Sequence, residues 1–468
     1  MQKKERAQWG SKIGFILAAA GSAIGLGNIW KFPGKAYEGG GGTYLLIYIA
    51  IVVLIGMPAM LAELSLGRAT RANTVDAFKK LNKRFTWVGY LGVISAFIIT
   101  CYYSHVGGWV LRYVFSYVTE PKAVYADSLG YFYNMLGYNA STGATFMPWT
   151  ALAFAAVFLA LNAVIIIRGV QGGIEKFSKY CMPALFVLLF VLLIRSVTID
   201  GAKEGVKYLL TFNFEALTFD TLLSALGQAF YSLSLGMAIM ITYGSYVAKE
   251  ENLAKNTVLI CSMDTLVAII AGFIVIPAVF ATMGSGSVGK GGGFAFASLA
   301  GVFENMPMGS LFGVVFYLLL LFAALTSCIS LTEGIVAFIT ERVKISRKAC
   351  TIILCVVMYL IGCLYACSQA AFDWKGIWFD FTNKLTYPAL GDFMEYLTDR
   401  LLIPVGALFT SIFVGWVWKP GSSLAEVESG CTVKKALRTA YGILIKYVVP
   451  LSILVILLVS LIKGATLS

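Results

Sequence analysis

Residues 13–33 read Ile13-Gly-Phe-Ile-Leu-Ala-Ala-Ala-Gly-Ser-Ala-Ile-Gly-Leu-Gly-Asn-Ile-Trp-Lys-Phe-Pro33, and this stretch decides how the rest of the chain is interpreted. It is long and apolar enough to cross a membrane, yet Gly21, Gly25, Gly27 and Asn28 interrupt its middle. Each glycine destabilises a helix interior by about 1 kcal/mol relative to alanine, and backbone groups freed within lipid must bind something. We therefore predict a broken membrane helix whose freed groups bind ions or a small polar substrate.

Apolar runs of similar length recur along the whole chain. Hydrophobic residues make up 59% of it and charged residues only 13%, which favours a membrane protein with many spans. We expect eleven membrane helices, although ten or twelve remain possible because interrupted runs can be split or merged. The expected spans are about 13–36, 44–66, 87–117, 149–167, 178–197, 218–246, 257–283, 311–340, 350–367, 399–418 and 442–463. The predicted fold class is an all-α membrane protein with a single transmembrane domain, residues 1–468.

The positive charges are distributed unevenly between the two sides of the predicted bundle. The formal net charge is +12, which in a soluble chain could indicate a nucleic-acid partner. Lysine and arginine instead gather before the first span and in alternate connecting segments, with few in the segments between them. This asymmetry is typical of a positive inner face. It predicts a multi-pass protein of the cell inner (plasma) membrane, with a cytoplasmic N-terminus, a C-terminus outside and no nucleic-acid partner.

A second interrupted run lies about 205 residues after the first. It reads Gly227-Gln-Ala-Phe-Tyr-Ser-Leu-Ser-Leu-Gly-Met-Ala-Ile-Met240, with two serines and Gly236 at its centre. Broken helices at corresponding positions indicate two structural repeats, and an odd number of spans per repeat makes the second repeat inverted relative to the first. We expect these inverted repeats of five plus five helices at about 11–197 and 217–419, with helix 11 at about 442–463 as an addition.

Three further polar features fall at mid-membrane depth. Ser232 and Ser234 lie in the second break, Asp264 is a lone carboxylate in an apolar run, and Thr326 and Ser327 are adjacent hydroxyls in another run. Hard cations prefer oxygen donors, and a charge buried in a membrane usually marks function. Each feature alone also has a structural explanation: a kink, a protonated acid that forms a hydrogen bond, or hydroxyls that join helices. Their coincidence with two helix breaks favours an ion site.

With these residues in view, the chain resembles the neurotransmitter:sodium symporters in their bacterial amino-acid-transporter form, over about residues 6–463. The resemblance rests on the motifs Gly21-Ser-Ala-Ile-Gly-Leu-Gly-Asn-Ile-Trp-Lys-Phe-Pro33, Glu38-Gly-Gly-Gly-Gly42, Glu63…Gly67-Arg68, Tyr231-Ser-Leu-Ser-Leu-Gly236, Ile241-Thr-Tyr-Gly-Ser-Tyr246 and Leu325-Thr-Ser327. It implies the leucine-transporter fold with broken helices 1 and 6, a prokaryotic source, and Na⁺-coupled amino-acid symport by alternating access. The expected partners are the amino-acid substrate and the lipid bilayer, with no obligate protein partner.

The resemblance also implies two Na⁺ sites. The first would use Ala23, Asn28, Ser232 and Asp264, together with the substrate carboxylate. The second would use Gly21, Ile24, Ala323, Thr326 and Ser327. Many animal members bind chloride near the first site, where the Asp264 carboxylate of this chain would take the place of the anion. We therefore expect two Na⁺ ions and no chloride.

The substrate pocket implied by the resemblance would combine Ser22, Ala23, Gly25, Leu26, Gly27, Ile99, Tyr103, Tyr231, Ser232, Ser234, Met237, Ser327, Cys328 and Leu331. Monoamine carriers have an aspartate at the position of Gly25, so glycine here leaves room for the substrate's own carboxylate. The Tyr103 hydroxyl and the amides of Leu26 and Gly27 would hold that carboxylate, while Ser234 and carbonyls near Tyr231 would hold the ammonium group. The remaining lining is mostly apolar, which favours neutral hydrophobic or aromatic L-amino acids.

Two gates are implied as well. The outer gate would pair Lys31 with Glu395, or alternatively with Asp399. The family usually has an arginine at the position of Lys31, so the charge is kept and the bidentate fork is lost. The inner gate would pair Arg6 with Glu341.

Three rival functions follow from the same residues. A proton-coupled amino-acid transporter would use Asp264 as the proton carrier. A channel fits less well, because two broken helices around a closed pocket suit occlusion better than a pore. An intramembrane enzyme fits least, since the sequence has a single histidine and no catalytic motif.

Overall fold

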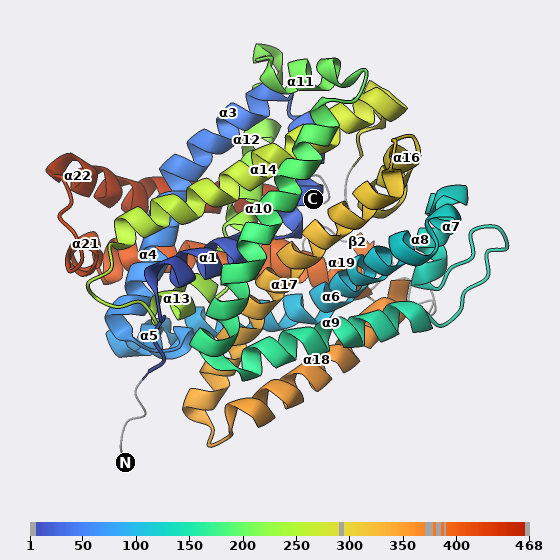
Figure 1. Ribbon diagram of the computed structural model, residues 1–468. Coiled ribbons are helices and arrows are strands. Elements are labelled where there is room, and N and C mark those ends of the chain that lie inside the picture. The colour runs from blue at the N-terminus through green and yellow to red at the C-terminus, as the bar shows by residue number, and fades with distance from the viewer. Residues whose placement is uncertain (1–5, 290–293, 370–377, 381–384, 388–389, 464–468) are drawn as a thin grey trace.

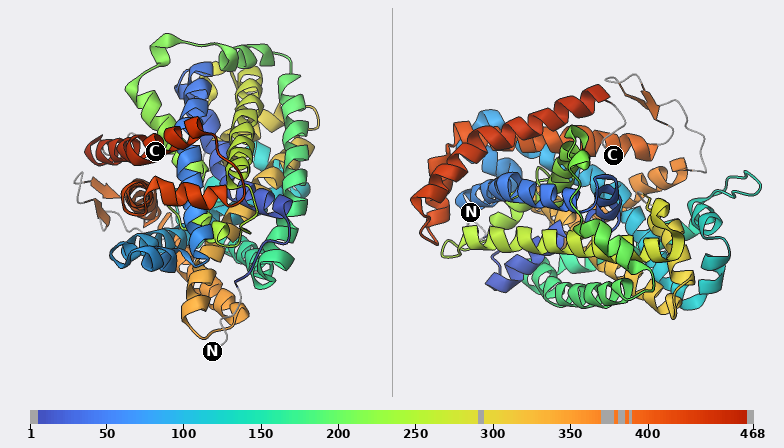
Figure 2. Two further views of the ribbon diagram at one scale, coloured as in Figure 1. Left: turned by 90° about the vertical axis from the view of Figure 1, so that its left-hand side faces the viewer. Right: turned by 90° about the horizontal axis from the view of Figure 1, so that it is seen from above.

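The computed structural model describes residues 6–289, 294–369, 378–380, 385–387 and 390–463. Figure 1 shows long helices lying side by side, with the first helix, α1, among them. The two ends of the bundle differ, as Figures 1 and 2 show: the start of the chain, α5, α21 and α22 gather at one end, and α7, α8 and α16 at the other. We call the first of these the N-terminal end and the second the opposite end.

The first half of the chain forms five apolar segments with short helices between them. Their elements are α1 (Lys12–Ala23), η1 (Gly27–Lys31), α2 (Phe32–Glu38), α3 (Gly42–Ile51), η2 (Val52–Gly56), α4 (Met57–Thr70), α5 (Thr74–Leu81), η3 (Lys83–Phe85), α6 (Thr86–Thr119), α7 (Pro121–Ala126), α8 (Ser128–Leu136), α9 (Trp149–Ile167), η4 (Val170–Glu175) and α10 (Lys176–Val197).

The second half continues with helices and one small hairpin. Its elements are α11 (Ala202–Leu210), η5 (Phe214–Ala216), α12 (Phe219–Ser232), α13 (Ile239–Gly244), α14 (Leu253–Met283), η6 (Ser285–Ser287), η7 (Phe294–Ser298), α16 (Leu299–Glu304), α17 (Gly309–Arg342), α18 (Arg347–Gln369), β1 (Trp378–Asp380), β2 (Leu385–Tyr387), α19 (Leu390–Glu395), η8 (Tyr396–Leu402), α20 (Ile403–Ile412), η9 (Phe413–Val417), α21 (Pro420–Glu428), α22 (Lys435–Ile443), η10 (Leu444–Val448) and α23 (Val449–Lys463). The strands β1 and β2 pair antiparallel, a feature that the sequence did not lead us to expect.

The described residues contain nine helices long and apolar enough to cross a membrane, and one bent pair, α1 with η1 and α2, that passes the same test with a 50° bend. The segment α12–α13 occupies the predicted sixth span, and neither of its pieces is long enough to count alone. All eleven predicted stretches are therefore helical, and the chain is an all-α membrane protein apart from the hairpin.

Three predicted helix starts are wrong. The fifth helical stretch starts at Val170, the tenth at Leu390 and the eleventh at Lys435, each earlier than expected. These early turns contain charged or glycine residues, which lowered their apparent hydropathy. In the structure apolar residues of these turns, such as Val170 and Met394, are buried, while polar ones such as Gln171 and Asp392 stay exposed.

Both predicted breaks are present, and they lie against each other at the centre of the bundle. The first helix ends at Ala23, and the extended backbone of Ile24 (φ −72°, ψ 95°) redirects the chain into η1. The segment between α12 and α13 is non-helical, with left-handed backbone at Ser234 (φ 53°), Gly236 (φ 77°) and Ala238 (φ 65°). Helices therefore end in the middle of the bundle at two places. The backbone amides and carbonyls at these ends lack partners within their own helices, and they face the same central region.

Candidate functional site

A cavity lies between the two breaks and the long helices α6 and α17. It is lined by Ser22, Ala23, Gly25, Leu26, Gly27, Asn28, Ile99, Tyr103, Tyr231, Ser232, Ser234, Met237, Ile239, Ser327 and Leu331. All but one of the predicted pocket residues are among them. The exception is Cys328, which is fully buried but does not line the cavity. Ser327 and Leu331 lie four residues apart on one face of α17, and a residue directly after Ser327 points away from that face.

Gly25 opens one side of this cavity. A Cβ atom at position 25 would lie 2.9 Å from Ser327 Oγ and 3.6 Å from Tyr103 Oη, so any larger residue would fill the space in front of both hydroxyls. The Tyr103 hydroxyl is buried near Ser327 and the Leu26 backbone, but no described residue lies in good hydrogen-bond geometry with it. A buried hydroxyl without a partner is costly, and a polar group of a ligand would satisfy it.

The carbonyl of Ser22, in the last turn of α1, accepts hydrogen bonds from two directions. The Ser234 hydroxyl of the second break donates at 3.0 Å, and the Ser327 hydroxyl of α17 donates at 3.2 Å. The first break therefore presents its freed carbonyls to both of the elements that the sequence singled out. The two serine hydroxyls thus supply hydrogen bonds to the Ser22 carbonyl. The same hydroxyls could also contact a bound ligand or ion.

Asp264 of α14 lies at the centre of a buried polar cluster. Its carboxylate accepts hydrogen bonds from Asn28 Nδ2 at 2.7 Å, from Ser232 Oγ at 2.8 Å and from Tyr48 Oη at 3.5 Å. Asp264 is 0% exposed, and among the described residues no lysine, arginine or histidine lies within 4.0 Å of its carboxylate. A carboxylate with only neutral donors around it is a favourable place for a small cation. Three of the four residues predicted for the first Na⁺ site thus touch one another, and the fourth, Ala23, lines the adjoining cavity.

The residues predicted for the second Na⁺ site meet where α1 packs on α17. A Cβ atom at Gly21 would lie 3.2 Å from Thr326 Cβ, so the two helices are in close contact there. The Thr326 hydroxyl donates to the Ala323 carbonyl at 3.1 Å, and Ile24, the residue after α1, is fully buried. This group offers neutral hydroxyl and carbonyl oxygens, which suit a hard monovalent cation.

Glu63 of α4 takes part in the second break in a way that the sequence does not reveal. Its Oε1 accepts a hydrogen bond from the Gly236 amide at 2.8 Å, while its Oε2 is buried with no partner among the described residues. Gly236 has a positive φ, and a Cβ atom there would lie 2.7 Å from the Ile403 carbonyl, so only glycine fits. The only sequence signal was the presence of a carboxylate within an apolar run.

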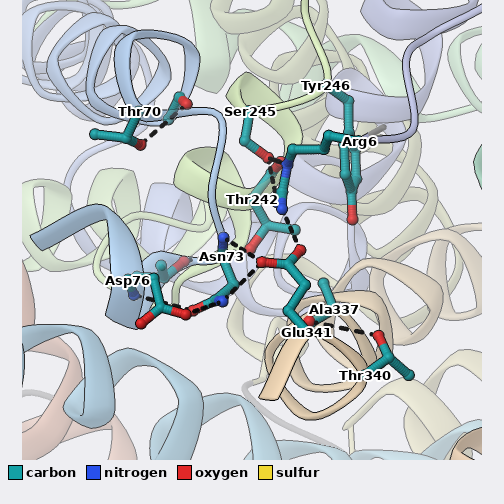
Figure 3. A network of polar contacts seen from close by, with 12 residues as sticks. Arg6, Thr70, Asn73, Asp76, Thr242, Ser245, Tyr246, Ala337, Thr340 and Glu341 are labelled. Carbon is teal, nitrogen blue, oxygen red and sulfur yellow. Dashed lines mark hydrogen bonds and ion pairs between the residues drawn. The ribbon is translucent and has the colours of Figure 1, made fainter. Parts of the chain in front are cut away.

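Arg6 and Glu341 are joined at the N-terminal end, as the sequence predicted, and Figure 3 shows the network around them. Arg6 also donates to Ser245 Oγ through Nε (2.9 Å) and Nη2 (2.6 Å), and its guanidinium lies 4.8 Å from the Tyr246 ring centre. Glu341 accepts from the amide and the side chain of Asn73, at 3.1 and 2.8 Å. Together Arg6, Asn73, Ser245, Tyr246 and Glu341 form what we call the N-terminal gate.

Lys31 lies on the other side of the cavity and pairs with Asp399, not with Glu395. Its Nζ is 3.7 Å from Asp399 Oδ2 and 4.6 Å from the centre of the Tyr231 ring. The favoured pairing with Glu395 is therefore replaced by the alternative that the sequence allowed. Glu395 lies one helical turn before Asp399, too far along the helix to form an ion pair with Lys31 within 4.0 Å. We call Lys31, Tyr231 and Asp399 the Lys31 gate.

The similarity to known proteins agrees with this geometry. A family profile described as "Sodium:neurotransmitter symporter family" matches residues 6–127 and 130–468. The chain is 37% identical over 465 residues to an "Uncharacterized sodium-dependent transporter YhdH" of Bacillus subtilis, covering 98% of each protein. It is 33% identical over 470 residues to an "Uncharacterized sodium-dependent transporter" of Haemophilus influenzae, covering 98% of this chain and 99% of that protein.

Among solved structures, the chain is similar to MhsT in complex with L-phenylalanine. The TM-score is 0.83 at 35% sequence identity, and the match covers 97% of this chain and 99% of that chain. The chain therefore belongs to the sodium:neurotransmitter symporter family, and it is a membrane transporter rather than an enzyme.

Proposed function

We propose that this chain carries neutral, mainly hydrophobic or aromatic, L-amino acids across a membrane together with Na⁺, independently of chloride. One observation carries the proposal: a cavity with an unpartnered Tyr103 hydroxyl adjoins the buried, cation-free carboxylate cluster of Asp264. A zwitterion and a cation side by side would satisfy both. Membership of a family of sodium-dependent transporters supports the same reading.

The amino-acid backbone would bind where Gly25 leaves space. Its carboxylate would accept a hydrogen bond from Tyr103, and its ammonium group would donate to the oxygens around Ser234 and Tyr231. Its side chain would face Ile99, Met237, Ile239 and Leu331. None of the described residues that line the cavity is a lysine, arginine, aspartate or glutamate, so a charged side chain would have no partner of opposite charge among them. The bound L-phenylalanine of MhsT is consistent with this preference.

Two Na⁺ ions would provide the coupling. Ala23, Asn28, Ser232 and Asp264 would hold the first next to the substrate carboxylate, and Gly21, Ile24, Ala323, Thr326 and Ser327 would hold the second. Each ion that moves down a membrane potential of about 100 mV contributes about 2.3 kcal/mol to substrate accumulation. Because Na⁺ at the first site would contact the substrate, binding of each would favour binding of the other.

Chloride independence follows from the charge of Asp264. A carboxylate already lies at the position where an anion would otherwise be needed to balance Na⁺. Replacing chloride by gluconate at constant Na⁺ should leave uptake unchanged. In Asp264→Asn uptake should fall, and added chloride should restore part of it, whereas the exposed control Asp200→Asn should behave as the wild type. Wild-type uptake that collapses in gluconate would refute this part of the proposal.

A proton could take the place of Na⁺, because a buried carboxylate surrounded by neutral donors also suits a proton carrier. Uptake in proteoliposomes, measured at fixed pH while Na⁺ is varied, distinguishes the two. We also propose inverted repeats at about 11–197 and 217–419 that rearrange around the cavity, a cytoplasmic N-terminus and an outside C-terminus. The mutual contact of the two breaks through Ser22 and Ser234 supports the repeats.

The experiment that tests the substrate is an uptake screen of the twenty amino acids with and without a Na⁺ gradient. We expect the neutral apolar and aromatic amino acids to be stimulated most, and lysine, arginine, aspartate and glutamate not at all. Lack of Na⁺ stimulation for all twenty would overturn the proposal. The variant Gly25→Asp is the matched probe of the pocket: a carboxylate in front of Tyr103 should abolish amino-acid uptake even if the protein folds.

A further inference from the structure

A second, larger cavity lies at the N-terminal end, away from the site described above. It is a groove between α4, the start of α14, α21 and α22, with a volume of about 190 Å³ against about 40 Å³ for the central cavity. Figures 1 and 2 show α21 and α22 together at this end of the bundle. Its walls include Val53 and Leu61 from the second span, Val258 from α14 and Leu437 and Leu444 from α22 and η10.

The interior of the groove is suited to hydrocarbon. Among the described residues of the lining, only Thr257 and Tyr441 carry side-chain hydroxyls, and both hydroxyls already form hydrogen bonds. The Thr257 hydroxyl donates to the Leu253 carbonyl at 2.8 Å, and the Tyr441 hydroxyl lies 2.7 Å from Ser423 Oγ. Val53, Val258 and Leu437 are 47–60% exposed, so the groove opens on the lateral surface that faces lipid. A polar ligand would find no partner inside, whereas an acyl chain would.

The rim of the groove is basic. Lys255 follows the lining residue Ala254, and Lys434 and Lys435 follow the lining residue Val433. All three lysines are exposed, and within the part of the chain that the structure describes none forms an ion pair within 4.0 Å. The helix α22, which begins the eleventh span, thus has exposed apolar residues close to lysines that form no ion pair among the described residues, as expected where a span enters the headgroup region.

We propose that this groove binds an anionic phospholipid of the bilayer, with one acyl chain between α4 and α22 and the headgroup against Lys255, Lys434 and Lys435. The argument is charge complementarity added to an apolar cavity that opens on lipid. The lipid would hold α21 and α22 against α4, where Ser65 Oγ lies 2.8 Å from Ser423 Oγ and Arg68 is paired with Glu426. The site is independent of the proposed transport chemistry.

Native mass spectrometry of the full chain in a neutral detergent tests the proposal. Phosphatidylglycerol and phosphatidylcholine with identical acyl chains are titrated separately, and the first bound lipid is counted. We expect phosphatidylglycerol to bind about tenfold more tightly than phosphatidylcholine, because its headgroup is negative overall near three lysines, whereas the choline cation cancels the phosphate charge. The double variant Lys434→Gln/Lys435→Gln should lose most of this preference. The control Lys344→Gln/Lys348→Gln, two exposed lysines outside the groove, should keep it.

A second variant tests the apolar part. Ala440→Trp fills the groove and should remove the first bound lipid of either kind, while circular dichroism verifies that the helices are intact. Equal binding of the two lipids by the wild type, or equal effects of the two lysine pairs, would overturn the proposal. A dimer that forms without lipid and is lost in Ala440→Trp would overturn it in favour of a second copy of this chain.

Discussion

The two gates on either side of the central cavity are built differently. In the N-terminal gate one arginine is held by a carboxylate, a serine hydroxyl and a tyrosine ring, and the same carboxylate is tied to Asn73 on a third element. The Lys31 gate consists of one ion pair, 3.7 Å long, between side chains that are 31% and 26% exposed, together with a tyrosine ring. A partly exposed pair of this length contributes little, whereas several hydrogen bonds to one charge reinforce one another.

This difference indicates which end of the transporter is sealed in this structure. Trp9 strengthens the N-terminal gate further, because its indole nitrogen donates to the Tyr243 carbonyl at 3.1 Å and its ring packs edge-on against Tyr243. The chain before α1 is thereby fixed over the segment after the second break. At the Lys31 end, no described segment is held across the entrance in the way that Trp9 holds the chain before α1. Entry to the cavity from that end therefore requires the smaller rearrangement.

The largest effect should come from breaking the strong gate. Arg6→Ala leaves Glu341 and Ser245 without their charged donor and shifts the population toward a state open at the N-terminal end. Several charge-assisted bonds are lost at about 1.5–3 kcal/mol each, so Na⁺-driven uptake should fall at least about tenfold. The control Arg84→Ala removes an exposed arginine with no ion pair among the described residues. Equal uptake by the two variants would show that the network is not a gate.

A smaller loss of uptake is expected from variants of the Lys31 gate. The same experiment decides whether Lys31 pairs with Asp399 or with Glu395. Asp399→Asn should lower uptake about threefold, the change expected for an exposed ion pair of about 0.2–1 kcal/mol. Glu395→Gln, one turn away on the same helical segment, is the matched control and should have less than half that effect. A larger loss of uptake in Glu395→Gln than in Asp399→Asn would favour the pairing of Lys31 with Glu395 that the sequence analysis preferred.

The smallest effect, a change in thermal stability, is expected at Asp76, which accepts a hydrogen bond from Asn73 of the N-terminal gate. Partial burial raises the pKa of the Asp76 carboxyl, but hydrogen bonds from Arg342 and Asn73 and the Arg342 charge outweigh burial and lower the pKa overall. Asp76 therefore stabilises the folded protein above its unfolded pKa, and this contribution is lost as pH falls through the lowered folded pKa. In detergent at pH 7, Asp76→Asn should lower the midpoint of thermal unfolding by a few degrees at most.

The control for Asp76→Asn is the pH dependence of its thermal unfolding midpoint. The difference between Asp76→Asn and the wild type should shrink as the carboxyl becomes protonated, because both then carry a neutral side chain at position 76. A difference that stays constant down to the acid end of the titration would mean that Asp76 acts through packing and not through its charge.

The central part of the site could be predicted from sequence because its signals are local. Glycines and Asn28 in one apolar run, serines in a second and Asp264 in a third each conflict with a lipid-buried helix, and each conflict marks a group that binds something. The structure brings these residues to one cavity. Their positions in the chain were enough to predict the site. A helix breaks within a membrane only where protein or ligand can form hydrogen bonds with the backbone groups that the break exposes.

Other features could not be predicted because they depend on conformation or distant contacts. Ile239 lines the cavity directly after Ala238, whose left-handed backbone is a conformation that helical periodicity cannot reveal. Cys328 was expected in the pocket, yet it faces away from the side of α17 shared by Ser327 and Leu331. The choice of Asp399 over Glu395 depends on one turn of helix, a smaller shift than matching motifs by eye can resolve.

The most direct test of the central claim, that Na⁺ drives transport through this cavity, is the Na⁺ dependence of uptake in proteoliposomes. The amino acid most stimulated in the screen is supplied at a fixed concentration while choline replaces Na⁺ at constant ionic strength, at pH 6.5 and again at pH 8.0, with no pH gradient. We predict a saturable rise with Na⁺ of at least about tenfold at both pH values, because the two proposed oxygen-lined sites would be filled before the cavity closes. Uptake that ignores Na⁺ and follows an imposed pH gradient would contradict the account and make Asp264 a proton carrier.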